Sequence, residues 1–313
     1  MNGIIYFGSN AFGIPSLEEL KKRCNLLGVV TAPDRPRGRG LKVSCTDIKE
    51  WAIRNNVPVF QPESLSDKDF KGTLRSVRPE FIVLISYGRI LPSSILEIPS
   101  LAAINVHPSL LPQYRGAAPM EWALINGEKE TGLTVMVMHD IMDAGHIMTQ
   151  KKIVIDEKDD IFSLRERLSR MAPEILLDSM KKFREGIKPS PQRGTPTYAR
   201  KLAKEDGLIR WDRPVAEIHN LIRGTKEWPG AYTYLDGRYF KIFRSEPVDG
   251  YGISGEPGTV IGTGQDNDSI YVACLKGVLK IEEVQVEGKR RMPAAEFLRG
   301  CRIRTGDRFS GTR

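Results

Sequence analysis

Cysteine and histidine are scarce in this chain, whose 313 residues contain four of each. The cysteines are Cys24, Cys45, Cys274 and Cys301. They lie far apart and form no C-x-x-C pair, and an intracellular chain does not normally keep disulfides. His139 and His146 have no third ligand at metal-site spacing. We therefore expect four reduced thiols and no bound metal.

Long apolar runs are also missing. No stretch approaches the ~20 apolar residues that a membrane-spanning helix needs. The N-terminus, MNGIIYFGSNAFGIP, has no positively charged region and only a short apolar run, which argues against a signal peptide. We therefore expect a cytoplasmic protein that does not enter a membrane. A chain of 313 residues is long enough for about two domains.

Acidic residues are fewer than basic ones, 39 against 47, which gives a formal net charge of +8. A basic balance favours a polyanionic partner, provided that the charge is clustered. The stretch DRPRGRGLK at residues 34–42 holds three arginines and one lysine among glycines and a proline. It is either a solvated basic loop or a nucleic-acid contact, and its composition alone does not decide between them.

Short apolar runs alternate with helical stretches in the first part of the chain. The expected strands are residues 3–7, 26–32, 80–86, 101–106 and 131–138. Residues 10–23 read as a helix with Asn10 as its N-cap. Residues 161–185 read as another, which Pro173 should kink or split and Gly186 should end. Continuous apolar strands of this kind predict an α/β doubly wound domain over residues 1–185.

Composition changes at residue 186. Residues 186–207, GIKPSPQRGTPTYARKLAKEDG, hold three prolines and three glycines without apolar periodicity, which is typical of a linker. Residues 208–313 then give a helix at 213–224, several short β-type runs within 231–287 and a short helix near 293–299. This pattern predicts a small antiparallel barrel or sandwich.

Polar side chains stand at the end of one expected strand. Asn105 and His107 are two residues apart, so they point to the same face. Pro108 ends the pairing of that strand. Open α/β sheets bind ligands at the carboxyl ends of their strands. The alternative is that both residues merely satisfy local backbone groups, and their spacing alone leaves that alternative open.

A second strand also runs into polar residues. Residues 132–147, GLTVMVMHDIMDAGHI, offer Asp140 and Asp143 as carboxylates for the same crevice, although aspartate is also common in turns. An Asn, a His and an Asp at neighbouring strand ends would suit acyl transfer, which needs an oxyanion donor and a proton shuttle. A hydrolytic triad is less favoured, because no Ser or Cys lies in a nucleophile elbow.

The segment that links these strands resembles a known family. Residues 106–147, VHPSLLPQYRGAAPMEWALINGEKETGLTVMVMHDIMDAGHI, are similar to the signature region of the folate-dependent formyltransferases. The resemblance extends along nearly the whole chain and includes TAPDRPRGRGLKV (31–43), SYGRILP (86–92) and QVEGKRRMPAAEFLRG (285–300). It implies a Rossmann-like formyltransferase domain followed by an OB-like β-barrel domain, with 10-formyltetrahydrofolate as the formyl donor.

The family's catalytic residues correspond to Asn105, His107 and Asp143 of this sequence. The Asn105 amide would hydrogen-bond the formyl oxygen as negative charge develops there. His107 would face that oxygen or the leaving nitrogen, and Asp143 would orient the imidazole and favour its charged form. Asp143 could also accept the amine's proton, directly or through water.

The resemblance also implies two sets of binding residues. The folate pocket would involve Ser86, Tyr87, Gly88, Ile90, Ser109, Leu110, Leu111 and Pro112. The tRNA contacts would be Arg35, Arg37, Arg39, Lys42, Lys289, Arg290 and Arg291, with Arg39 the most important. The implied reaction transfers a formyl group to the α-amine of methionine on initiator methionyl-tRNA, for translation initiation, and a monomer is the default expectation.

Two competing functions remain at this point. A sugar-nucleotide N-formyltransferase or a formyltetrahydrofolate hydrolase could share the catalytic trio, but the basic loop at 34–42 and the KRRM stretch argue against both. An OB-containing RNA-binding protein that has lost catalysis is the other alternative, and the intact Asn105, His107 and Asp143 argue against it.

Overall fold

The computed structural model describes residues 3–37, 42–248, 255–264, 268–301 and 303–312. The chain forms two compact units. The first comprises Met1–Pro119, Glu130–Val154 and Arg165–Arg200, and the second comprises Met120–Lys129, Ile155–Leu164 and Lys201–Arg313. Among the described residues, no helix is both long enough and apolar enough to span a membrane. The domain boundaries expected at residues 185 and 208 stay a prediction.

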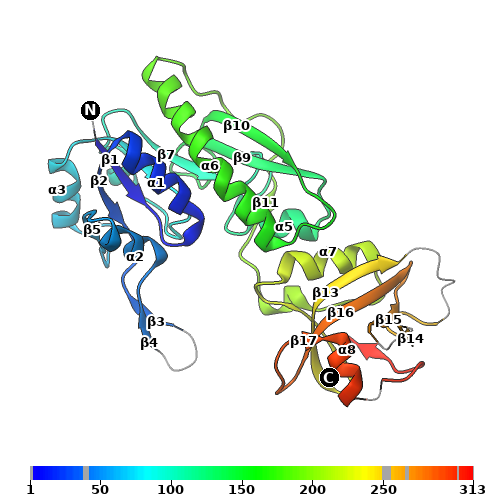
Figure 1. Cartoon of the computed structure of the whole chain (residues 1–313). Coiled ribbons are helices and arrows are strands. Elements are labelled where there is room, and N and C mark those ends of the chain that lie inside the picture. Colours follow the sequence, from blue (N-terminus) through cyan, green and yellow to red (C-terminus); the bar gives the residue numbers. More distant parts are fainter. Residues whose placement is uncertain (1–2, 38–41, 249–254, 265–267, 302, 313) are drawn as a thin grey trace. The chain divides into compact units, whose positions relative to one another are not determined.

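The first unit is built on a seven-stranded sheet in the order β10-β9-β7-β6-β1-β2-β5 (Figure 1). Its strands are β1 (Gly3–Phe7), β2 (Asn25–Val30), β5 (Val59–Phe60), β6 (Pro79–Leu84), β7 (Ala102–His107), β9 (Glu130–Val137) and β10 (Ile147–Val154). The five strands from β5 to β7 are parallel, whereas β9 and β10 add to the β7 edge in antiparallel order. The carboxyl ends of the five parallel strands therefore meet at one edge.

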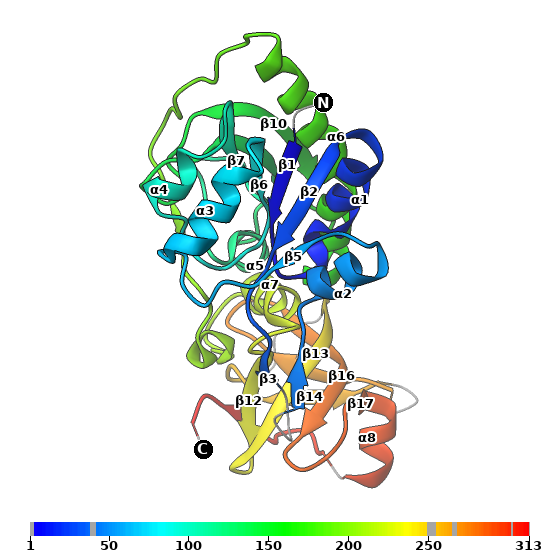
Figure 2. The same cartoon turned by 90° about the vertical axis from the view of Figure 1, so that its left-hand side faces the viewer.

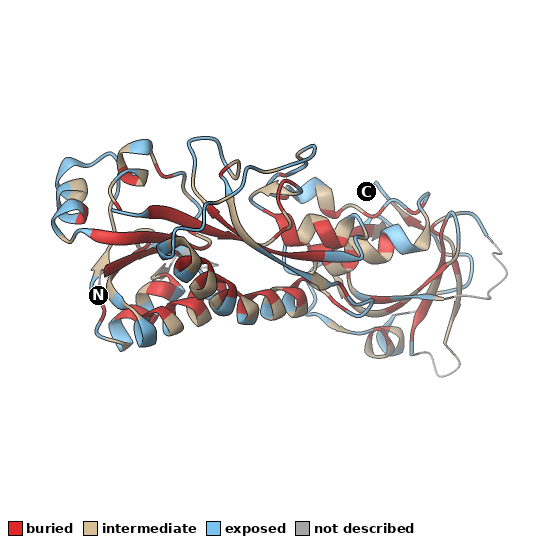
Figure 3. Cartoon of the chain, turned by 90° about the horizontal axis from the view of Figure 1, so that it is seen from above, coloured by how far each residue is buried: buried red, intermediate tan, exposed pale blue. Residues whose placement is uncertain are grey.

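Helices cover both faces of this sheet (Figure 2). They are α1 (Ile14–Arg23), α2 (Asp47–Arg54), α3 (Lys68–Ser76), α4 (Ser93–Leu96) and α6 (Ile161–Arg184). Helices α1, α2 and α6 lie on one face, and α3 and α4 lie on the other. Every residue of β1, β6 and β7 is buried, and Figure 3 shows strands of the chain that are red over most of their length. This double burial is why the strands are continuous apolar runs, and the predicted doubly wound domain is confirmed.

Two of the expected helix signals can be checked directly. The Asn10 side chain accepts a hydrogen bond from the Phe12 N–H, at 3.1 Å, and caps a 3₁₀ turn (η1, Ala11–Gly13) that leads into α1. Of the kink or split expected at Pro173, the split is wrong, because α6 runs without interruption through that residue, and the kink stays a prediction. One proline removes a single backbone hydrogen bond. Buried residues on both sides of it, Leu168 and Leu176 among them, keep the helix packed on the sheet.

The remaining short elements of the chain join or flank these. They are β3 (Arg35–Arg37), β4 (Lys42–Ser44), β8 (Arg115–Gly116), α5 (Pro119–Ile125), β11 (Tyr198–Ala199) and η2 (Lys204–Gly207). Strands β3 and β4 pair with each other as a hairpin. Strand β11, which lies inside the stretch expected to be a linker, pairs with β8.

The second unit contains an antiparallel sheet in the order β14-β15-β16-β13-β12-β18, with β17 paired to β16. Its elements are α7 (Val215–Thr225), β12 (Ala231–Leu235), β13 (Arg238–Val248), β14 (Val260–Thr263), β15 (Ile270–Ala273), β16 (Val278–Val286), β17 (Met292–Pro293), α8 (Ala294–Gly300) and β18 (Phe309–Ser310). Backbone hydrogen bonds from Val260 to Asp307 and from Phe309 to Gly258 join the two ends of the sheet. The sheet therefore curls into a closed barrel around buried residues such as Trp211, Phe240 and Ile281.

Candidate active site

Strand β7 carries Asn105 and His107 to the carboxyl-end edge of the parallel sheet. Both are nearly buried, with 8% and 5% of their surface exposed. The neighbouring strands fix the backbone on both sides, since Asn105 pairs with Leu84 of β6 and His107 with Thr134 of β9. The structure thus places the two side chains at the strand end where the sequence predicted them.

The His107 ring lies between two oxygen atoms. Its Nε2 is 2.9 Å from the carbonyl oxygen of Tyr114, and its Nδ1 is 3.7 Å from Oδ2 of Asp143. A carbonyl oxygen can only accept a hydrogen bond, so the hydrogen of this contact belongs to Nε2. A proton on Nδ1 would therefore face the Asp143 carboxylate.

Asp143, and not Asp140, is the carboxylate beside the histidine. The Asp143 side chain is 10% exposed, and its Oδ2 accepts a hydrogen bond of 2.8 Å from the Gly116 N–H. Asp140 is exposed and accepts a hydrogen bond from Ser93 Oγ at 2.7 Å. The residue pattern left the two carboxylates open and the resemblance pointed to Asp143, which is the one that the structure places beside His107.

Two glycines allow the segments around Asp143 to approach closely. Gly116 has a φ of +124°, and a Cβ there would lie 2.5 Å from the carbonyl oxygen of Ala199. A Cβ on Gly145 would lie 1.7 Å from the carbonyl oxygen of Val137. Gly116, which follows Arg115, and Gly145, two residues after Asp143, are therefore required by backbone packing at the site.

The expected folate residues of the 109–112 loop follow His107 directly and are fixed on β9 and β10. Thr134 Oγ1 donates to the Ser109 carbonyl at 2.7 Å and accepts from the Leu111 N–H at 3.1 Å. Gln150 Nε2 donates to the Leu111 carbonyl at 2.8 Å. The Leu110 side chain lies over Gly132, where a Cβ would meet it at 2.7 Å. This loop is therefore anchored beside β7, with Pro112 at its end.

The other expected folate residues follow β6, the strand next to β7. Tyr87 is buried and packs edge-on against Phe7, with ring centroids 5.3 Å apart. Ser86 and Gly88 have φ values of +52° and +79°, so the chain turns sharply away from the sheet here. Ile90 is 69% exposed. Both sets of expected folate residues thus leave the sheet from adjacent strands at the same edge.

The expected tRNA contacts differ in how they are engaged. Arg35 is exposed and lies 3.9 Å from Glu63, while Arg37 and Lys42 pair through their backbones in the β3–β4 hairpin. Arg39 lies outside the described residues. In the second unit, Lys289 is exposed. Arg290 forms an ion pair with Glu296, and Arg291 pairs with Glu283 while lying over the Phe243 ring.

The sequence interpretation missed the contacts of residues 190–199, a segment that we call the strap. The stretch expected to be a linker is bonded to the first unit here. Ser190 exchanges two backbone hydrogen bonds with Ile147, and Thr197 Oγ1 accepts from the Tyr114 N–H at 2.8 Å. Gln192 Nε2 donates to the Asp143 carbonyl at 2.7 Å. These are backbone and amide contacts without apolar periodicity, so the sequence pattern gives no signal for them.

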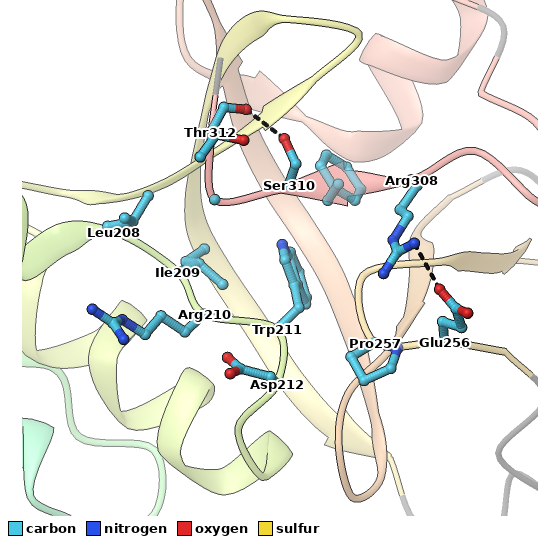
Figure 4. Close-up of a pocket in the computed structure, with 12 residues that line it drawn as sticks. Leu208, Ile209, Arg210, Trp211, Asp212, Glu256, Pro257, Arg308, Ser310 and Thr312 are labelled. Carbon is cyan, nitrogen blue, oxygen red and sulfur yellow. Dashed lines mark hydrogen bonds and ion pairs between the residues drawn. The ribbon is translucent and has the colours of Figure 1, made fainter.

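The second unit holds a separate cavity of about 810 Å³, shown in Figure 4. Its lining mixes apolar residues such as Trp211 and Pro257 with charged ones, and Arg308 is paired with Glu256 at 2.6 Å. It contains none of the expected catalytic residues. The constellation suited to acyl transfer is therefore the one on β7. No described group of His, Cys, Asp and Glu side chains could hold a metal ion.

This arrangement agrees with family comparisons. Residues 4–180 match the formyl transferase family model, and residues 201–302 match the formyl transferase C-terminal domain model. The chain belongs to the formyl transferase family.

Individual relatives show which members of the family this chain is similar to over its full length. The chain is 45% identical to the methionyl-tRNA formyltransferase of Pelobacter propionicus, over 98% of this chain and 96% of that protein. It is 44% identical to the methionyl-tRNA formyltransferase of Thermodesulfovibrio yellowstonii, over 99% of each. Among solved structures, the N-formyltransferase from Helicobacter canadensis in complex with folinic acid and dTDP-3-aminofucose superposes with a TM-score of 0.66, at 18% identity, over 93% of this chain and 100% of that one. That likeness shows the fold alone.

Proposed function

We propose that this protein transfers a formyl group from 10-formyltetrahydrofolate to the α-amine of methionine on initiator methionyl-tRNA. The observation that carries the proposal is the pairing of His107 with Asp143 at the end of β7, beside Asn105. Full-length identity of 45% to a methionyl-tRNA formyltransferase supports this acceptor over an amino sugar. We further propose that the protein works as a monomer in the cytoplasm, since one chain supplies the whole constellation.

The substrate amine is itself the nucleophile, so no covalent enzyme intermediate is needed. Its nitrogen bonds to the formyl carbon, and the Asn105 amide donates to the oxygen on which negative charge develops. The bond from that carbon to N10 of the folate then breaks. The amine loses one proton, to Asp143 directly or through water. N10 gains one from Nε2 of the His107 imidazolium, which gives up its hydrogen bond to the Tyr114 carbonyl in this step. Asp143 also compensates the charge of the imidazolium from the Nδ1 side.

The folate co-substrate fits the two loops at this edge of the sheet. The 109–112 loop is anchored through Thr134 and Gln150, so its position is set before binding. The Ser86–Ile90 turn offers backbone groups and the exposed Ile90 side chain. Rigid polar backbone beside apolar side chains is the usual composition of a site for an aromatic ligand. We assign the folate to Ser86, Tyr87, Gly88, Ile90, Ser109, Leu110, Leu111 and Pro112.

We propose that the basic loop at residues 34–42 and Lys289 contact the tRNA. Arg290 and Arg291 should contribute less to tRNA binding. The carboxylates close to Arg290 and Arg291 offset the charge of these arginines, whereas Glu63 lies 3.9 Å from Arg35 and offsets its charge less. The loop residues Arg35, Arg37, Arg39 and Lys42 have the composition for phosphate and base contacts.

Lys204 and Lys241 of the second unit form a basic pair that is better suited to bind a phosphate. Lys204 Nζ lies 5.9 Å from the centre of the Tyr239 ring, and Lys241 Nζ donates to the Pro229 carbonyl at 2.8 Å. Neither ammonium forms an ion pair with a described carboxylate. Burial and the neighbouring Lys204 lower the pKa of Lys241. The half-buried Tyr239 ring lies beside Lys204, and the buried Tyr232 ring packs under it with ring centroids 4.9 Å apart. A bound phosphate would relieve the repulsion between the lysines.

Replacing both lysines, as Lys204→Gln with Lys241→Gln, should weaken tRNA binding several-fold and leave kcat unchanged. Each lost phosphate contact should reduce the slope of log K against log salt concentration by about 1. Filter binding of tRNA across a salt series measures both effects. Lys276→Gln removes an exposed lysine of the same unit and is the matched control. An unchanged slope in the double variant would contradict the assignment.

The proposed reaction itself is tested with three acceptors: initiator methionyl-tRNA, elongator methionyl-tRNA and an amino-sugar nucleotide, each with 10-formyltetrahydrofolate. We expect formylation of the initiator species only. Formylation of the sugar alone would overturn the proposal, and tRNA binding without turnover would favour a binding protein.

A further inference from the structure

The strap lies across the two segments that supply the oxygen partners of His107. One segment, residues 114–118, carries the Tyr114 carbonyl, and the other, residues 143–147, carries the Asp143 carboxylate. The strap is bonded to both of them at points along its length. Most of its residues are exposed, so it adds little apolar burial. Its contacts are therefore directional hydrogen bonds rather than core packing.

Gln192 connects both segments through a single side-chain amide. Its Nε2 donates to the carbonyl oxygens of Asp143, at 2.7 Å, and Gly145, at 2.9 Å. Its Oε1 accepts from the Arg115 guanidinium, at 2.7 Å from Nη2 and 3.2 Å from Nε. Both ends of the amide are thus used, one on each segment.

Thr197 and Ala199 hold the 114–118 segment from the other end of the strap. Thr197 Oγ1 accepts from the Tyr114 N–H, and the Thr197 carbonyl accepts from the Arg115 N–H at 2.9 Å. The Ala199 carbonyl accepts from the Ala118 N–H at 3.1 Å. The carbonyl of Tyr114 faces His107 Nε2, so the hydroxyl of Thr197 helps to set the acceptor of the catalytic ring.

The backbone at both oxygen partners needs such support. Asp143 has a φ of +53° and Tyr114 a φ of +59°, which non-glycine residues rarely adopt. Such conformations persist where surrounding contacts hold them. In each case one side-chain contact to that residue's own backbone comes from the strap.

We propose that Gln192 and Thr197 are positioning residues for formyl transfer: they hold the Asp143 and Tyr114 backbones so that both ring nitrogens of His107 meet their oxygen partners. The inference rests on the catalytic roles assigned above. The strap, which continues beyond residue 200 into the second unit, thereby sets the positions of the two oxygen partners of His107. A displacement of even about 1 Å at reacting groups can cost a large factor in rate, with little change in substrate binding.

The test compares paired substitutions in the full-length protein. Gln192→Glu keeps the shape and the acceptor for Arg115 but loses both donated hydrogen bonds, and Gln192→Met removes the amide without adding charge. Each should lower kcat for formylation of initiator methionyl-tRNA by about ten-fold. The KM values for tRNA and folate should stay within about two-fold of those of the unsubstituted protein.

Thr197 supplies a second pair and a rescue. Thr197→Val should lower kcat in the same way, whereas Thr197→Ser keeps the hydroxyl and should retain activity. Ser190→Ala is the control within the strap, because Ser190 acts through its backbone.

Kinetic outcomes separate this inference from the proposed function. Normal kcat in Gln192→Met and Thr197→Val, in a preparation whose unsubstituted protein formylates tRNA, would overturn the positioning role alone. So would a loss expressed only in KM, or equal losses in Thr197→Val and Thr197→Ser. If the Gln192 variants do not fold, the Thr197 pair decides. An inactive unsubstituted protein would instead reject the proposed function.

Discussion

Replacing His107 by alanine should lower kcat for formyl transfer by about 10³-fold, within the range of about 10² to 10⁴ typical for general acid–base groups. The ring is 5% exposed and is held between the Tyr114 carbonyl and Asp143, so no neighbouring group can take its place. Affinity for initiator tRNA should be unchanged, because the side chain is buried at the end of β7. Single-turnover formylation and tRNA binding, measured on one preparation, check both expectations.

The matched control is His146→Ala. His146 is exposed and lies three residues from Asp143, so it tests for a general effect of removing an imidazole from this region. It should retain full activity. If His107→Ala were as active as the control, His107 would be a strand-end residue without a catalytic role.

Replacing Asp143 by asparagine should lower kcat by about 10²-fold. The substitution preserves the shape of the side chain and an oxygen able to accept from the Gly116 N–H. It removes the negative charge that lies 3.7 Å from Nδ1 of His107. The loss should therefore appear in kcat, with the melting temperature within a few degrees of that of the unsubstituted protein.

Asp140→Asn is the control for this substitution. Asp140 belongs to the same loop, but its carboxylate accepts from Ser93, and an asparagine oxygen can accept that bond as well. It should leave kcat unchanged. Equal losses in the two variants would indicate that the loop as a whole, rather than the carboxylate beside His107, determines the rate.

The strands and the residues at their ends were predictable because their signals are local. Buried parallel strands such as β1 are continuous apolar runs, and residues two apart on a strand share a face. Asn105, His107 and Pro108 therefore stood out within a few residues of sequence. The resemblance to formyltransferases then assigned chemistry to them. The family matches confirm the family, and the roles of these residues stay a prediction.

Other features depend on contacts between distant segments. The antiparallel placement of β9 and β10 and the closure of the barrel by Val260 and Phe309 are long-range pairings without a local pattern. The uninterrupted course of α6 also depends on distant contacts, because the packing of this helix against the sheet outweighs the tendency of Pro173 to split it.

By itself, the sequence determined the two kinds of domain, the apolar strands, and the Asn105 and His107 pair at a strand end. The resemblance pointed to Asp143, but only the tertiary structure showed that its carboxylate, and not that of Asp140, lies beside His107, and only the tertiary structure brought Gln192 and Thr197 to the site. The physical reason is the range of the interactions. Strand and helix periodicity records which side chains face a core, whereas a hydrogen bond from a half-buried amide to a carbonyl 49 residues away leaves no periodic trace in the sequence.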